Sequence, residues 1–231
     1  MRCLVCGEAV EKGKGWEHLR SVHLEPLGVT QKDILEHAEK TAHPIKIRTS
    51  YITFINLREN IIYFSLENAE ILIAFAKKHG NISWTEVVEW QILHEKGHVS
   101  CRELYNYPRS FKPYILLNVE DYYINKYLIP EEYWRVCIIN ARCSTAIRNI
   151  TPLPNNLRDG YFYCTLATFL AYDAVTINDL NFLNPDEVRF VEIVSNCFKQ
   201  LKNANDILSV NKNISTIFDQ LFPQVRISRN S

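Results

Sequence analysis

Four side chains that commonly ligate metal ions lie within residues 1–26 and limit how this segment can fold. Cys3 and Cys6 are separated by two residues, His18 follows after eleven more, and His23 after another four. So short a segment holds too few apolar side chains to fold by itself, and metal binding would have to supply its folding free energy. The spacing therefore predicts a structural Zn²⁺ held by the four side chains. The alternative is a thiol pair with incidental histidines.

Composition places the whole chain among globular proteins. Of its 231 residues, 47% are hydrophobic and 12% are aromatic, which excludes a disordered protein. The 26 basic and 26 acidic residues cancel, and this balance argues against a chain that coats nucleic acid or anionic lipid by bulk charge. No segment approaches the roughly 18 uncharged apolar residues of a membrane helix, and the N-terminus lacks the apolar run of a signal peptide. We therefore expect a soluble, cytoplasmic protein without membrane contact.

The hydrophobic period changes along the chain and predicts short elements in a defined order. Residues 45–55 and 61–66 are rich in β-branched and aromatic side chains, so we expect two strands that form a hairpin. Helical periodicity occupies nearly all of the remainder. The expected helices cover about 30–40, 69–80, 84–105 and 114–128, with a further helix opened at 184–187 by a proline and two acids.

The sharpest motif is the pentapeptide His-Glu-Lys-Gly-His at residues 94–98, called the HEKGH segment below. A capping box at 83–86 begins the helix that this motif requires. On a helix, His94 and His98 project from one face and can both bind one Zn²⁺. Glu95 is rotated by roughly 100° and can instead take the proton of a zinc-bound water. Composition alone predicts about 0.016 such motifs in the chain. The alternative is two surface histidines beside an exposed glutamate.

A catalytic zinc site needs a third protein ligand and leaves one position open for water. The next expected helix contains the adjacent acids Glu120 and Asp121, and Asn125 lies one turn after Asp121. Asp121 with Asn125 as a supporting residue is one candidate, and Glu120, which has the longer side chain, is its rival. Alternatively, both acids lie near the N-terminus of their helix and only interact favourably with the helix dipole.

Residues 45–130 resemble the zincin metallopeptidases, particularly the gluzincins, and also the compact ImmA/IrrE-type peptidases. The HEKGH segment and the pair Asp121 and Asn125, followed by Pro130, carry this resemblance. It implies that His94, His98 and one of the two acids hold a catalytic Zn²⁺, and that Glu95 acts as base and then as acid. In these peptidases the third ligand is a glutamate, and it would fall on the shorter Asp121. The resemblance also implies that a strand at 60–65 binds an extended substrate along its edge.

Such a peptidase also needs a donor that stabilises the oxyanion of the transition state. Several tyrosines and one arginine of the second half of the chain qualify, and the residues alone leave the choice open. The candidates are Tyr122, Tyr123, Arg148, Tyr161 and Tyr163.

The segment 1–26 resembles a C2H2-type zinc finger, although the distance between its cysteines and histidines is one residue short of the common spacing. The resemblance implies a ββα fold whose apolar contacts come from Val10, Trp16, Leu19 and Val22. Four basic and four acidic residues cancel within the segment, and its helix offers only Glu17 and Arg20 to a partner. Because DNA-reading fingers rely on cations, we expect contact with a protein, or with the neighbouring domain, ahead of DNA.

These observations predict an α+β fold: a small ββα-type zinc finger at 1–26, a mainly helical zincin-like domain with a short antiparallel sheet at 30–223, and a flexible tail at 224–231. The expected function is a zinc-dependent metallopeptidase that hydrolyses a protein or peptide substrate and is targeted by its finger. It would bind one catalytic and one structural Zn²⁺. The alternative is a zinc-finger regulatory or nucleic-acid-binding protein with a degenerate or structural peptidase-like site. A missing third ligand would favour this alternative.

Overall fold

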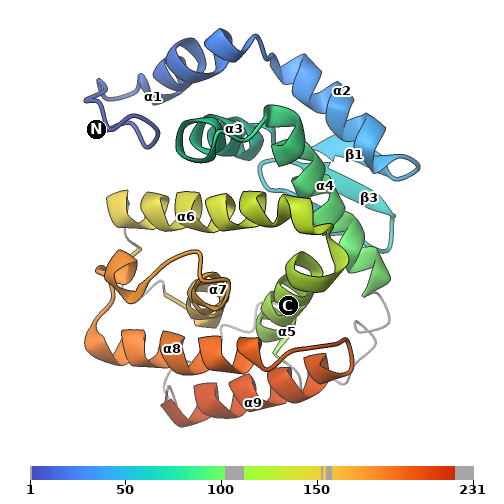
Figure 1. Ribbon diagram of the computed structural model, residues 1–231, viewed down its shortest axis with the longest axis vertical. Helices are drawn as coiled ribbons and strands as arrows, with labels where there is room; N and C mark the ends of the chain where they lie inside the picture. The colour runs from blue at the N-terminus through green and yellow to red at the C-terminus, as the bar shows by residue number, and fades with distance from the viewer. Residues whose placement is uncertain (1, 102–111, 152, 155–157, 222–231) are drawn as a thin grey trace. The chain divides into compact units, whose positions relative to one another are not determined.

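The computed structural model describes residues 2–101, 112–151, 153–154 and 158–221. Their fold is mostly helical, with one small three-stranded sheet (Figure 1). The chain divides into a first unit, Met1–Glu103 with Ile129–Cys143, and a second unit, Leu104–Leu128 with Ser144–Ser231. Each unit is described by itself below. The predicted domain limits stay a prediction, and the expected tail at 224–231 lies outside the described residues.

The N-terminal segment (residues 2–27) consists of a loop and a helix. One antiparallel bridge joins Arg2 to Ala9, and this bridge stands where the ββα pattern predicted two strands. The short helix α1 (Gly15–His18) continues into the π-helix η1 (Leu19–Leu24) and the 3-10 turn η2 (Glu25–Leu27).

The apolar contacts of the N-terminal segment differ in part from those predicted. Val10 and Leu19 are buried as expected, whereas Trp16 and Val22 are 39% and 45% exposed. Leu24 is buried at the end of η1 instead. The helix therefore turns Trp16 and Val22 outward, and the prediction that they fill the interior of the segment was wrong.

The sheet is formed by β1 (Lys46–Thr49), β2 (Phe54–Asn56) and β3 (Ile61–Phe64) in the order β1-β3-β2. β2 pairs with β3 in antiparallel fashion as the hairpin predicted, but β1 pairs with the other edge of β3 and runs parallel to it. The expected antiparallel sheet is therefore a mixed one. The expected single strand at 45–55 is broken between Thr49 and Phe54 by a bend at Tyr51 and Ile52, which are 87% and 61% exposed.

Beside this sheet, the first unit contains the helices α2 (Gln31–Ala42), α3 (Leu66–Gly80) and α4 (Trp84–Ser100). α2 contacts β1, and α4 contacts β2 as well as α2 and α3 (Figure 1). The capping box predicted at 83–86 is present at the start of α4, and α2 also begins with a capping box, formed by Thr30 and Asp33. α3 begins three residues earlier than expected because the Ser65 side chain accepts a hydrogen bond from the Asn68 N–H. α4 ends at Ser100, and residues 102–105 of the expected helix lie outside the described part of the chain.

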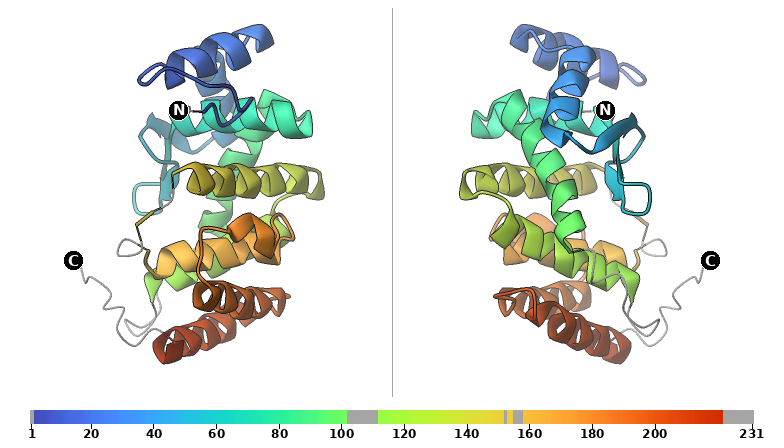
Figure 2. Two further views of the ribbon diagram at one scale, coloured as in Figure 1. Left: turned by 90° about the vertical axis from the view of Figure 1, so that its left-hand side faces the viewer. Right: turned by 90° about the vertical axis from the view of Figure 1, so that its right-hand side faces the viewer.

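The described part of the second unit is helical. It contains α5 (Pro113–Tyr123), the π-helix η4 (Ile124–Leu128), α7 (Gly160–Ala171), the 3-10 turn η7 (Ile177–Leu180), α8 (Pro185–Lys199) and α9 (Asp206–Leu221). α7 packs against α5 and α8, and α9 also contacts both of these helices; α8 and α9 lie side by side in Figure 2. The 3-10 turn η5 (Glu131–Tyr133) belongs to the first unit, and α6 (Trp134–Ile150) contributes residues to both units.

Candidate metal centres

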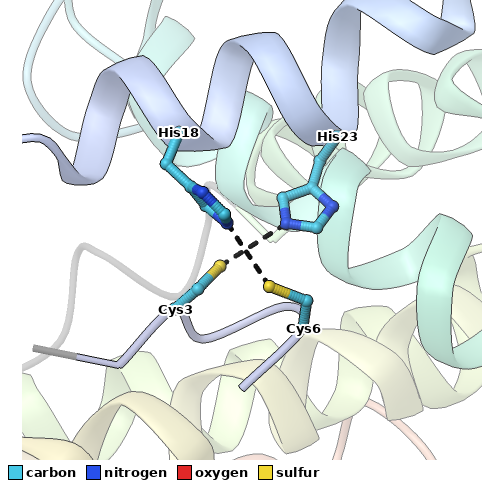
Figure 3. A group of neighbouring side chains, drawn as sticks. All are labelled: Cys3, Cys6, His18 and His23. Carbon is cyan, nitrogen blue, oxygen red and sulfur yellow. Dashed lines mark hydrogen bonds between the residues drawn. The ribbon is translucent and has the colours of Figure 1, made fainter. Parts of the chain in front are cut away.

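The fold brings together the four predicted ligands of the N-terminal segment, here called the Cys/His cluster (Cys3, Cys6, His18 and His23). One ligand atom from each side chain lies within 4.8 Å of the other three. Figure 3 shows the cysteines converging from the loop and the histidines from the helix above it. Cys3 Sγ lies 3.5 Å from His23 Nε2, and Cys6 Sγ lies 3.3 Å from His18 Nε2.

These separations suit a tetrahedral metal ion. Zinc bonds of about 2.3 Å to sulfur and about 2.0 Å to nitrogen place the two ligand atoms roughly 3.5 Å apart at a tetrahedral angle. Two sulfurs and two imidazole nitrogens are also a donor set that selects such an ion. The Cys/His cluster is therefore compatible with a bound metal ion in both its distances and its chemistry.

Local backbone geometry explains why both cysteines face the histidines. The Val5 N–H donates to Cys3 Sγ at 3.4 Å, and the Gly7 N–H donates to the Cys3 carbonyl at 2.9 Å. Gly7 has φ of 76°, a left-handed conformation that glycine adopts without strain. His18 and His23 are five residues apart, which would separate them on an α-helix. The i→i+5 repeat of the π-helix η1 instead brings them to one side.

The surroundings of the cluster also affect its protonation. Burial lowers the pKa of His23, and the neighbouring His18 lowers it further, so the imidazole is held in the neutral form that binds metal. Burial raises the pKa of the Cys6 thiol in the absence of metal. Metal binding at this cluster would therefore release a thiol proton.

The HEKGH segment is helical, as predicted, and lies in the second half of α4. The rings of His94 and His98 are 5.1 Å apart between centroids at an angle of 89°, so they share one face of the helix. Trp90 packs one turn earlier, with its ring 5.9 Å from His94. Glu95 and His98 are only 7% and 5% exposed, so neither is a surface side chain.

The candidate third ligands lie in the second unit, whereas the two histidines lie in the first. Glu120 and Asp121 are adjacent on α5, and Glu120 is fully buried whereas Asp121 is half-buried. Asn125 follows one turn after Asp121 in η4 and is buried. The ligation of one metal by His94, His98 and either acid therefore stays a prediction.

Tyr172, which the sequence did not single out, organises the turn that carries Asp121 and Asn125. Asn125 Nδ2 donates to Tyr172 Oη at 3.0 Å, and the Tyr172 hydroxyl donates to the Asp121 carbonyl at 3.2 Å. The ring of Tyr172 stacks on Tyr122 with centroids 5.2 Å apart. No sequence motif marks Tyr172, because it reaches this turn only through the packing of α7 against α5.

The candidates for the oxyanion donor have diverse surroundings. Tyr163 donates to Glu187 Oε1 at 2.6 Å in the interior of the second unit. Tyr122 is buried beside Tyr172, and burial raises its pKa to about 12. Arg148 donates to a backbone carbonyl of its own helix and lies over two phenylalanine rings. The two remaining candidates are Tyr123 on α5 and Tyr161 on α7.

The strand expected to bind substrate has no free edge. β3 (Ile61–Phe64) pairs with β1 on one side and with β2 on the other, so another strand cannot be added to it. The prediction for residues 60–65 was therefore wrong. It failed because a segment's β propensity does not reveal how many neighbours it has. Within the described residues, β1 and β2 are the edge strands of this sheet, and β2 is the one that contacts α4.

Comparisons with known proteins yield no relative. No protein-family model matches the chain, and the searches of curated proteins and of solved structures find no match either. Among the helices of the described residues, none has both the length and the apolar character needed to cross a membrane.

Proposed function

We propose that this chain is a zinc-dependent metallopeptidase whose reaction centre includes the HEKGH segment. The observation that carries the proposal is the arrangement of this segment on α4. Two imidazoles share one helix face, and their rings are 5.1 Å apart. Glu95, which lies between them in the sequence, has a buried side chain. Two histidines one turn apart with an adjacent glutamate are the arrangement that zinc-assisted hydrolysis of a carbonyl compound requires.

Each residue has a defined role in the proposal. His94 and His98 hold Zn²⁺ together with Asp121 or Glu120. Asp121 is the better candidate because Asn125 lies on its helix face and is fixed by the hydroxyl of Tyr172. The zinc ion, when bound, polarises the substrate carbonyl and lowers the pKa of an attacking water. Glu95 accepts the proton of that water and then gives it to the leaving amine.

The substrate in this proposal is a protein or peptide in extended conformation. β2 is an edge strand and contacts α4, so a peptide paired with its backbone would lie next to the helix that carries the HEKGH segment. The N-terminal finger is proposed to direct the enzyme through contact with a protein or with DNA.

The test compares two glutamates of the same helix. Glu95→Gln should retain its zinc and lose hydrolysis of a peptide library by about 10²–10⁴-fold, the usual contribution of a general base. Glu89→Gln is the matched control, since Glu89 also lies on α4 but accepts hydrogen bonds from His37 and Tyr133. It should keep the parent rate. Parent-like hydrolysis by Glu95→Gln, with zinc measured by elemental analysis, would exclude this mechanism.

A second candidate is a zinc-stabilised regulatory or nucleic-acid-binding protein. The Cys/His cluster favours it, because all four of its ligands lie in one unit. The zinc content of the purified chain separates the two functions. A content of about two ions per chain supports the peptidase. A content of about one, abolished in the Cys3→Ser, Cys6→Ser variant, supports the second candidate.

A further inference from the structure

An ion pair joins the N-terminal segment to α3, and only one of its two side chains is buried. The Arg20 guanidinium donates to both oxygens of Glu70, from Nε to Oε1 at 3.1 Å and from Nη2 to Oε2 at 3.0 Å. The Glu70 side chain is 3% exposed, whereas Arg20 is 46% exposed. A carboxylate buried to this degree is costly without a countercharge. Among the described residues, Arg20 is the cation that forms an ion pair with Glu70.

A second contact joins the other half of the cluster to the same helix. His79 Nε2 lies 3.2 Å from the carbonyl oxygen of Val5, which accepts the hydrogen bond. Val5 lies between the two cysteines in the sequence, and its side chain is buried. Glu70 and His79 are nine positions apart, a distance of roughly 13 Å along α3. The cysteine loop and the histidine helix therefore contact α3 at two separate points. A bound metal would join these two parts of the segment.

These contacts also occupy the group that a nucleic acid would need. Arg20 is the cation that the finger helix was expected to offer to a partner, and two of its three guanidinium nitrogens, Nε and Nη2, donate to Glu70. Glu17, the other polar residue considered for this role, pairs with Lys14 at 2.9 Å. The helix face around Arg20 is therefore directed to the protein's own α3.

We propose that the Cys/His cluster is a structural zinc site that clamps the N-terminal segment onto α3 through Arg20 and Glu70, so that zinc binding stabilises the first unit as a whole. Zinc holds the cysteine loop against η1 and thereby fixes the positions of Val5 and Arg20. Loss of zinc releases both, and Glu70 loses its countercharge. α3 packs against α4, so the clamp also supports the helix that carries the HEKGH segment. The proposal does not depend on peptidase activity.

The experiment measures amide hydrogen exchange of the full-length chain with zinc and after chelation. The parent carries His94→Ala and His98→Ala, which leave the Cys/His cluster as the one proposed metal site. Chelation should accelerate the exchange of α3 amides (66–80) by about a hundredfold, and added zinc should restore their protection. Cobalt substitution should give the absorption of a cobalt–thiolate bond. The proposal would be overturned if chelation left the hydrogen exchange of α3 unchanged, or if the cobalt-substituted chain showed no cobalt–thiolate absorption.

Variants of the ion pair locate the coupling. In Arg20→Met the cluster should still bind cobalt through its thiolates, while the effect of chelation on α3 exchange should shrink at least about tenfold. Lys14→Met is the matched control, because the pair Lys14 and Glu17 is exposed on the same segment. It should behave as the parent. If Arg20→Met does not fold, the double variant Arg20→Met, Glu70→Met removes both charges and should show the same reduced coupling. Full coupling in either ion-pair variant would refute the role of Arg20.

Discussion

The two candidate metal centres of this chain are assembled from ligands at very different sequence separations. The Cys/His cluster takes all four ligands from residues 3–23, which lie in one unit. The HEKGH segment supplies two ligands one helix turn apart, and its proposed third ligand belongs to the other unit. The first centre therefore depends on a short segment and its metal, whereas the proposed second centre would need ligands from both units.

The helices that carry the ligands differ in the same way. α1 (Gly15–His18) has no side-chain cap at Lys14 and no buried residue, so it depends on a metal and on the contacts of η1, which continues it. α4 begins with the capping box of Ser83 and Glu86 and buries much of its length, including Val87, Val88 and Ile92. A metal should accordingly be a folding requirement at the first centre and an addition to a formed helix at the second.

The largest expected effect separates these two roles directly. His18→Ala should abolish metal binding at the Cys/His cluster and unfold residues 15–24. Zinc binding supplies about 10–16 kcal/mol to segments of this kind, which exceeds any other single interaction in them. His94→Ala should remove the metal of the HEKGH segment while α4 stays folded. Hydrogen exchange of residues 15–24 and 84–100, with zinc analysis, gives the measurement. Equal loss of protection in both helices would erase the distinction.

A buried ion pair in the second unit provides the next comparison. Arg158 and Glu187 in the second unit are each 6% exposed, and Arg158 also donates to the carbonyls of Leu153 and Phe182. Arg158→Met should lower the free energy of unfolding by about 3–5 kcal/mol, because it leaves Glu187 buried and uncompensated. Chelation should not change this loss in a denaturant titration. A loss of stability that depends on zinc would show that the Arg158–Glu187 pair, like the Arg20–Glu70 pair, is coupled to a metal.

The same pair predicts a dependence on pH. Burial alone would raise the pKa of Glu187. Hydrogen bonds to its carboxylate outweigh burial and lower that pKa; they come from the Tyr163 hydroxyl, the Asn184 backbone N–H and the Arg158 guanidinium. Its stabilisation should therefore be complete above the unfolded pKa of about 4.3 and disappear as the pH falls through the folded pKa. Glu187→Gln should flatten the unfolding free energy over this acid range.

The parts of the fold that could be predicted are those whose signals are local in sequence. The capping box of α4 needs residues three positions apart, and it was predicted and is present. α8 begins, as predicted, with a proline in its first positions and two acids in its first turn. The convergence of the Cys/His cluster follows from similar short spacings. His94 and His98 also lie on one helix face, as their separation of four residues requires.

The parts that could not be predicted depend on which segments become neighbours. The sequence of β3 is apolar enough for a strand, but only the tertiary fold places β1 on its second edge. Trp16 and Val22 face outward because Arg20 and the buried side of η1 turn toward α3. Glu70 and Tyr172 carry no motif, and their partners lie about fifty residues away in the chain. Pairings at such distances leave no periodic signal in one sequence.

Tyr172 permits a test of the longer-range centre. Tyr172→Phe removes hydrogen bonds to Asn125 and to the Asp121 carbonyl, so we expect a loss of about 1–2 kcal/mol in stability. If Asp121 is the third ligand, zinc affinity at the HEKGH segment should also fall about 10–100-fold. Tyr122→Phe is the control, since its ring stacks on Tyr172 and its hydroxyl has no hydrogen bond to a described residue. Unchanged zinc affinity would favour Glu120 as the ligand.

The smallest expected effect concerns the cap that makes α4 independent of metal. Ser83 Oγ accepts a hydrogen bond from the Glu86 N–H at 3.3 Å and donates to Glu86 Oε2 at 2.7 Å. Ser83→Ala should cost about 1 kcal/mol of unfolding free energy, and the cost should be the same with zinc and after chelation. Thr30→Ala, which removes the equivalent cap of α2, is the matched control. A chelation-dependent cost in Ser83→Ala alone would mean that α4, like α1, needs a metal to hold its first turn.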